Sequence, residues 1–188
     1  MIQAKRRDRK IAITDIAITK IPYVKIPELD ELAAKELYDA HREVLSAAQR
    51  LNNSNEVALV YNLYTKERYM VMGDACHVDV DNDIGIRTLQ KKSYAGDLVL
   101  VYNYPTTAKF SLADIDYFIA NDYIGMMTVV TNQGDVYLIR KTACYCYERA
   151  KELELILIKQ YSLEEQALIV ERFLKECAKG GIVYAEGR

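Results

Sequence analysis

The chain has 188 residues, 51% hydrophobic and 28% charged, and its formal net charge at pH 7 is -2. This composition excludes a disordered chain and suits one domain with a sizeable core, but not a second full domain. The small net charge provides no overall field that would attract nucleic acid or anionic lipid. The aromatic residues are 15 Tyr and 3 Phe with no Trp, so most aromatic surface has a polar tip, which suits half-buried and contact positions.

The N-terminal segment, residues 1–27, is predicted to be an arm that lies on the domain. It begins with a basic run that could contact phosphate, although such runs are usually solvated. The run consists of Lys5, Arg6, Arg7, Arg9 and Lys10. Isoleucines then alternate loosely over residues 11–21, and Pro22 and Pro27 follow. This pattern is typical of an extended arm or an edge strand.

Residues 28–142 are predicted to form the main domain, which begins with an amphipathic helix from Glu28 to about Leu51. Its apolar residues keep helical spacing along one stripe, and acidic residues occupy the first turn. The stripe consists of Leu29, Leu32, Leu37, Ala40, Val44, Ala47 and Leu51. We expect this helix to pack on a core.

Strands are predicted at 56–64, 68–72 and 98–102, because these runs are apolar and rich in β-branched and aromatic residues. A short helix is expected around 86–92. Ser111 is placed to cap a further helix that runs to about Asn121. A hairpin at 127–130 and 136–139 would enclose a turn at 132–135, whose glycine can adopt positive φ.

The C-terminal part, residues 143–188, is predicted to be a helical extension of the same domain, with helices at 144–159 and 163–179. Ser162 and Glu165 form a capping box for the second helix, and Gly180 and Gly181 end it. Its apolar stripe needs a partner surface, which is intramolecular by default and a homodimer contact in the alternative. The stripe comprises Leu163, Ala167, Val170, Leu174 and Cys177.

The remaining patterns favour a cytoplasmic protein without a membrane segment. No apolar run reaches the length of about 18 residues that a bilayer needs, and no signal peptide precedes the domain. Cys76, Cys144, Cys146 and Cys177 have no disulfide-framework spacing, which indicates reduced thiols. The acidic residues Asp79, Asp81 and Asp83 lack the glycine and glutamate of a calcium loop, so a solvated face is the better interpretation.

The stretch LVLVYNYPTTAKFSLADI, residues 98–115, carries the informative motif. It resembles the JAB/MPN family, including its RadC-like bacterial branch, in which a strand runs into H-N-H-P, a loop, S-x-x-D-I on a helix and a T-V-V hairpin. The family also has a glutamate on an earlier strand, where this chain has Glu56. The resemblance covers roughly residues 50–142 and implies a cytidine-deaminase-like, mixed β-sheet flanked by helices.

The family's chemistry implies a zinc ion held by two histidines and an aspartate, with the glutamate as general base. The histidine positions here are Tyr102 and Tyr104, while Asp114 matches the third ligand and Glu56 the base. Two neutral phenols and one carboxylate cannot compete for zinc at neutral pH. We therefore expect no metal and no other cofactor. Ser111 and Asp114 could also serve only as a helix cap.

Three functions remain open from the sequence. The resemblance and the loss of both histidines favour a non-catalytic module or scaffold that binds another protein, with Tyr102 and Tyr104 filling the former metal pocket. A second hypothesis is a phage or mobile-element accessory protein that inhibits a host defence or nucleic-acid enzyme, by analogy with such elements. A third is a residual isopeptidase or peptidase with an atypical site, for which the ligand set is incomplete.

Overall fold

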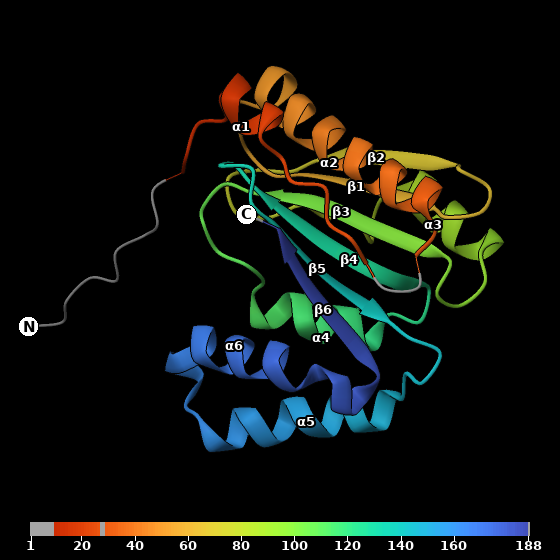
Figure 1. Cartoon of the computed structure of the whole chain (residues 1–188), viewed down its shortest axis with the longest axis vertical. Helices are drawn as coiled ribbons and strands as arrows, with labels where there is room; N and C mark the ends of the chain where they lie inside the picture. The colour runs from red at the N-terminus through yellow and green to blue at the C-terminus, as the bar shows by residue number, and fades with distance from the viewer. Residues whose placement is uncertain (1–9, 27–28, 188) are drawn as a thin grey trace, which may run out of the picture.

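One six-stranded mixed sheet forms the centre of the computed structural model, which describes residues 10–26 and 29–187 (Figure 1). The strand order is β2-β1-β3-β4-β5-β6, and only the β3–β4 pair is parallel. The strands are β1 (Val57–Asn62), β2 (Arg68–Met72), β3 (Leu98–Tyr104), β4 (Ile124–Thr131), β5 (Val136–Lys141) and β6 (Ile182–Gly187). The predicted α/β class, with a mixed sheet flanked by helices, is confirmed.

Helices cover both faces of this sheet, with α1 and α2 on one face and α4, α5 and α6 on the other (Figure 1). The helix α3 packs with the second group, because Ile86 and Leu89 belong to the same buried cluster as α4–α6. The helices are α1 (Asp15–Thr19), α2 (Glu31–Leu51), α3 (Ile84–Lys92), α4 (Leu112–Ala120), α5 (Tyr147–Gln160) and α6 (Gln166–Glu176). Two 3-10 turns, η1 (Leu163–Glu165) and η2 (Cys177–Gly180), flank α6.

The two cores follow from strand geometry, since successive side chains point to opposite faces of a sheet. In β1, Val57, Leu59 and Tyr61 pack against α2, whereas Ala58 and Val60 pack on the side of α3–α6. Every residue of β1 is buried. Strands buried on both faces read as continuous apolar runs, which is why they could be predicted from the sequence.

The prediction for the N-terminal arm was partly wrong. Residues 10–26 lie on the α2 face, where Ile13, Ile18 and Ile21 are buried, but they form the short helix α1 and no strand. Thr14 caps α1 by accepting a hydrogen bond from the Ala17 N–H, which explains why the loose alternation of isoleucines does not continue as extended chain. The long helix begins at Glu31, capped by Asp30, rather than at Glu28.

The C-terminal part was predicted to be purely helical, and this was wrong, because it ends in a strand. Its last segment, β6, pairs antiparallel with β5 and forms one edge of the sheet. Gly181 ends the preceding turn in the left-handed region, φ 75°, where glycine is favoured, and the chain then reverses into β6. Val170, Leu174 and Cys177 are buried against the same molecule, whereas Leu163 and Ala167 of the predicted stripe are exposed, so an intramolecular surface covers only the C-terminal part of the stripe.

Two buried asparagines connect four distant segments of the chain. The Asn132 side-chain amide donates to the carbonyls of Ile11 (2.7 Å) and Ser54 (3.0 Å) and accepts from the Asn103 amide (2.7 Å). Asn103 also donates to the Asn55 carbonyl and accepts from the Val57 N–H. These bonds satisfy polar groups that would otherwise be costly to bury.

Within the described part of the chain, no helix is both long enough and apolar enough to cross a bilayer.

Candidate functional site

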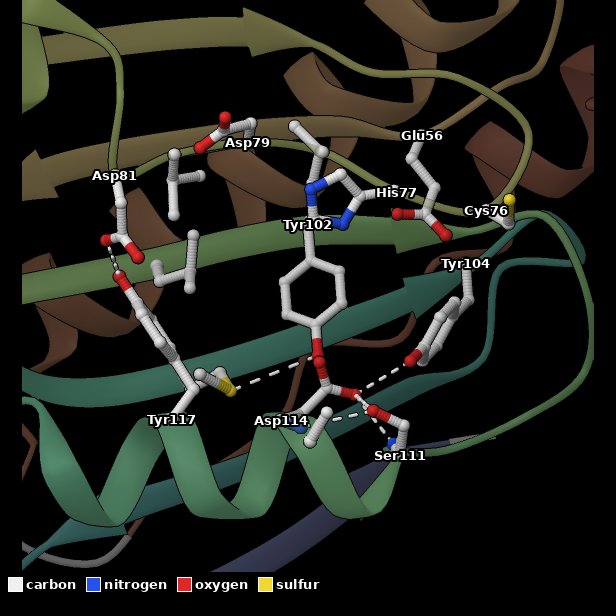
Figure 2. Close-up of a pocket in the computed structure, with 15 residues that line it drawn as sticks. Glu56, Cys76, His77, Asp79, Asp81, Tyr102, Tyr104, Ser111, Asp114 and Tyr117 are labelled. Carbon is white, nitrogen blue, oxygen red and sulfur yellow. Dashed lines mark hydrogen bonds between the residues drawn. The ribbon is translucent and has the colours of Figure 1, made fainter.

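A pocket of about 330 Å³ opens beside the end of β3 on the α3–α6 side of the sheet (Figure 2). All five residues that the motif singled out line it: Glu56, Tyr102, Tyr104, Ser111 and Asp114. They come from the residue before β1, from β3 and from the start of α4. Residues 76–81, from the loop between β2 and α3, form the opposite wall.

Pairing of β1 with β3 brings Glu56 to the pocket. The register pairs Ala58 with Tyr102, so Glu56 lies beside the end of β3. Asn103 holds both neighbours of Glu56, because it bonds the carbonyl of Asn55 and the N–H of Val57. The Glu56 backbone is fixed from the other side by hydrogen bonds with Asp74 and Gly73. Four hydrogen bonds from three partners, Asn103, Asp74 and Gly73, therefore hold the backbone around Glu56.

Asp114 is bound tightly within the protein. Its Oδ2 atom accepts hydrogen bonds from the Ser111 N–H (2.6 Å), the Ser111 hydroxyl (2.7 Å) and the Tyr104 hydroxyl (2.7 Å) (Figure 2). Its own N–H donates to the Ser111 hydroxyl at 3.1 Å, which completes a capping box at the start of α4. The predicted helix cap and the motif aspartate are thus the same structural unit.

Glu56 has the opposite environment. As a residue, Glu56 is 5% exposed. Its carboxyl oxygens face the pocket (Figure 2), and they accept no hydrogen bond from the described residues. Burial raises the pKa of this carboxyl group to about 7, and the nearby charges of Asp114 and Asp74 add to the shift. At neutral pH the group therefore exchanges readily between its acid and its carboxylate form.

The two tyrosines of the motif, Tyr102 and Tyr104, are neutral phenols. Burial, and then the charge of Asp114, raise the pKa of both Tyr102 and Tyr104 well above the ordinary value of about 10. Their rings meet edge to face, with centroids 5.5 Å apart. The Tyr102 hydroxyl lies 3.9 Å from the Met127 sulfur. The two rings thus occupy the part of the pocket beside Asp114 and Met127.

This donor set does not fit a zinc ion. Zinc prefers deprotonated thiolate, neutral imidazole and carboxylate ligands, whereas Tyr102 and Tyr104 keep their protons and Asp114 already accepts three hydrogen bonds on one oxygen. Over residues 10–26 and 29–187, no group of three His, Cys, Asp or Glu side chains is arranged to hold a metal ion. This includes Cys76, Cys144 and Cys146, which are free thiols.

Several pocket residues were missed in the sequence. His77, Asp81 and Tyr117 line it, and the Tyr117 hydroxyl donates to the Asp81 carboxylate at 2.7 Å. Asp83 was predicted to be solvated, but it caps α3 by accepting from the Ile86 N–H. The loop has no periodic pattern that would have placed these residues. The sequence offered one signal in this loop: Asp83 stands three residues before Ile86, which is the spacing of a helix N-cap.

The basic run lies away from this pocket where it can be followed. Lys5, Arg6, Arg7 and Arg9 fall outside the described residues. Lys10 donates to the Asn53 carbonyl (2.9 Å) and to the Asn55 side chain (3.0 Å). The described end of the run is thus held by protein atoms of the loop before β1.

Comparisons of the chain with protein-family models, with curated proteins and with solved structures give no significant match.

Proposed function

We propose that the chain is a degenerate relative of the JAB/MPN family, of the RadC-like branch, and that it acts as a metal-free, non-catalytic module that binds another protein. Two findings support the relationship. The motif order of Glu56, Tyr104-Pro105, Ser111 and Asp114 falls on a strand start, a strand end and a helix start, as the family pattern requires. The same residues converge on one pocket, although they lie up to 58 positions apart in the sequence.

The bonding of Asp114 carries the functional part of this proposal. A catalytic zinc site needs three protein ligands and an open position for water. Here Asp114 caps α4 and accepts a hydrogen bond from the Tyr104 hydroxyl. The Tyr102 ring packs edge to face against the Tyr104 ring. A pocket walled by tyrosines remains, and tyrosine is enriched in the residues that dominate protein–protein binding.

Zinc content tests the proposal directly. Wild-type protein, purified without chelator and dialysed against buffer with zinc, is expected to retain much less than one zinc per chain. The double variant Tyr102→His, Tyr104→His is expected to gain about one, because it restores two imidazoles next to Asp114. Adding Asp114→Asn to that variant should abolish the gain. One tightly held zinc in the wild type, measured by elemental analysis, would refute the proposal.

Hydrolysis separates the proposal from a residual peptidase. Wild type is expected to leave isopeptide-linked and linear peptide substrates intact, because Tyr102, Tyr104 and the hydrogen-bonded Asp114 do not form the ligand set of a metal ion that would activate water. Cleavage that is abolished by Glu56→Gln and retained in Glu152→Gln, which removes a charge from the exposed face of α5, would establish the peptidase instead.

Partner binding is tested by cross-linking in the native host. Wild type should yield a specific cross-linked protein, and Tyr117→Ala, which removes one pocket wall, should weaken the yield. A yield that depends instead on Lys5, Arg6, Arg7 and Arg9 and falls steeply with salt would point to a nucleic-acid complex.

A further inference from the structure

The pocket is acidic, and its charges are unevenly compensated. Four carboxylates line it, Glu56, Asp79, Asp81 and Asp114, and no lysine or arginine of the described residues does. Three of the four accept hydrogen bonds from the protein: Asp79 from Asn82, Asp81 from Tyr117, and Asp114 from Ser111 and Tyr104. Glu56 is the exception.

A buried carboxylate without a partner is unfavourable, since burial removes water without replacing its hydrogen bonds. Proteins compensate such a group with a cation or with hydrogen-bond donors. Glu56 is 5% exposed as a residue, and its carboxyl group faces the cavity and not a protein donor (Figure 2). A ligand that enters the cavity with a positive charge would supply the missing partner.

The walls favour an organic cation over a metal ion. Aromatic faces attract ammonium groups that lie within about 6 Å of the ring, and Tyr102, Tyr104 and Tyr117 all line the pocket. A metal ion would need several ligand atoms converging at a short distance, and no such group exists among the described residues. The volume of about 330 Å³ is near the lower end of small-molecule sites and suits a compact chain.

We propose that this pocket binds a primary alkyl ammonium group, as carried by a lysine side chain of the bound protein, with Glu56 as the counter-ion and the tyrosine rings around the alkyl chain. The inference rests on the proposed function, because it supplies the chemistry by which the module recognises its partner. The same chemistry could come from a free diamine, and the experiment distinguishes the two sources.

The test uses the full chain, labelled with nitrogen-15, and follows the backbone amide signals of the pocket residues in an NMR titration. The probes are n-butylammonium chloride, Nα-acetyl-lysine methylamide and 1,4-diaminobutane dihydrochloride, with n-butanol as the neutral control. The variants are Glu56→Gln, which keeps the shape of the side chain and removes its charge, and Glu152→Gln, which removes one charge on α5. Glu56→Gln should fold, because it removes a buried charge.

The three cationic probes should shift the pocket signals and n-butanol should not. Glu56→Gln should weaken binding by at least about tenfold, as expected when one partner of a desolvated ion pair is lost, while Glu152→Gln should bind within about twofold of the wild type. Tighter binding of the lysine derivative than of the diamine identifies a protein lysine as the ligand. The reverse order identifies a free diamine.

Three results would overturn the inference: equal binding of n-butanol, unchanged binding by Glu56→Gln, or displacement of n-butylammonium by millimolar magnesium or zinc chloride. These results are distinct from failure of the proposed function. A wild type that contains no zinc, cleaves nothing and ignores ammonium refutes this inference alone, whereas a zinc-loaded wild type refutes the proposed function.

Discussion

His41 and Glu56 are buried on opposite faces of the same sheet, and the two faces treat a titratable group in opposite ways. His41, on α2, is 1% exposed and sealed inside the packing of the N-terminal arm and α2. Glu56 is nearly as buried but faces a pocket. The α2 face therefore holds its buried titratable group, His41, away from solvent and ligands, whereas the α3–α6 face leaves the Glu56 carboxyl group accessible to a ligand in the pocket.

The hydrogen bonds on the α2 face determine the form of the histidine. The Thr128 hydroxyl donates to the Tyr137 carbonyl, so at its 2.8 Å contact with His41 it must accept from the Nε2–H. Nδ1 then carries a lone pair and has no partner among the described residues. Burial lowers the pKa of His41 to about 3, so the ring is neutral throughout the physiological range.

The largest expected effect breaks the packing of the closed face. Leu45→Ala on α2 should lower the free energy of unfolding by about 3–5 kcal/mol, because Leu45 is fully buried among tightly packed neighbours. Leu100→Ala, on the other face, should cost about 2 kcal/mol, since Leu100 lines the pocket and the new space is continuous with it. Urea denaturation measures both, with the exposed Leu32→Ala on α2 as control. Equal costs for Leu45 and Leu100 would contradict the comparison.

The second effect is the pH dependence of stability. The pKa of His41 is depressed in the native state, so its contribution is complete above about 6.5 and is lost as the pH falls toward 3. The pKa of Glu56 is raised, so its contribution is complete below about 4.5 and is lost as the pH rises through 7. The Glu56 contribution is at most about 3 kcal/mol. Between pH 4.5 and 6.5 the two contributions oppose each other.

Removing one group at a time should reveal the two slopes. In Glu56→Gln, unfolding free energy should rise with pH between 4.5 and 6.5 more steeply than in wild type, and the variant should be more stable at pH 8. In His41→Gln, unfolding free energy should fall with pH over the same window relative to wild type. Urea unfolding at half-unit pH steps provides the measurement. Curves that run parallel to the wild type would show that neither group is perturbed. Both variants retain Asp74, Asp114 and His77, the titratable residues around Glu56.

The smallest effect concerns the polar contacts of the pocket. Tyr104→Phe removes the hydroxyl that donates to Asp114, and it should lower the free energy of unfolding by about 1 kcal/mol. The loss is modest because Ser111 still donates twice to the same carboxylate. Tyr94→Phe, at an exposed position, should change nothing measurable in the same thermal unfolding experiment. A Tyr104→Phe variant as stable as the wild type would mean that this hydrogen bond contributes no stability.

The central strands β1, β3 and β4 could be predicted because they are buried on both faces and read as apolar runs. β2 was predicted with its observed bounds, 68–72. The strand predicted at 98–102 starts where β3 starts, at Leu98, but β3 continues to Tyr104. β6 was missed because its partner β5 lies some 40 residues earlier, whereas β2, the other edge strand and also only partly buried, directly follows its partner β1 along the chain. Gly180 and Gly181, which precede β6, were interpreted as the end of the last helix and not as a turn that returns the chain to the sheet.

The site was predicted only as far as the motif reached. Ser111, Asp114 and the two tyrosines follow each other closely in the sequence, and their convergence with Glu56 follows from the β1–β3 pairing. The loop at 76–81 could not be predicted, because its place depends on close backbone approach. A Cβ on Gly73 would lie 2.3 Å from the His77 carbonyl oxygen. His41 sits four residues from both Leu37 and Leu45, which are buried on the same helix, so its spacing contained a signal for a core position that no prediction used.

The asparagine pair has a consequence for how the molecule opens. Because the Asn132 side chain donates to the Ile11 carbonyl, the arm cannot detach without leaving one buried amide proton of Asn132 unpaired. Slow hydrogen exchange should therefore extend to the Ile13 N–H, which donates to the Ser54 hydroxyl, and its protection should match that of the central strands rather than that of an ordinary chain end.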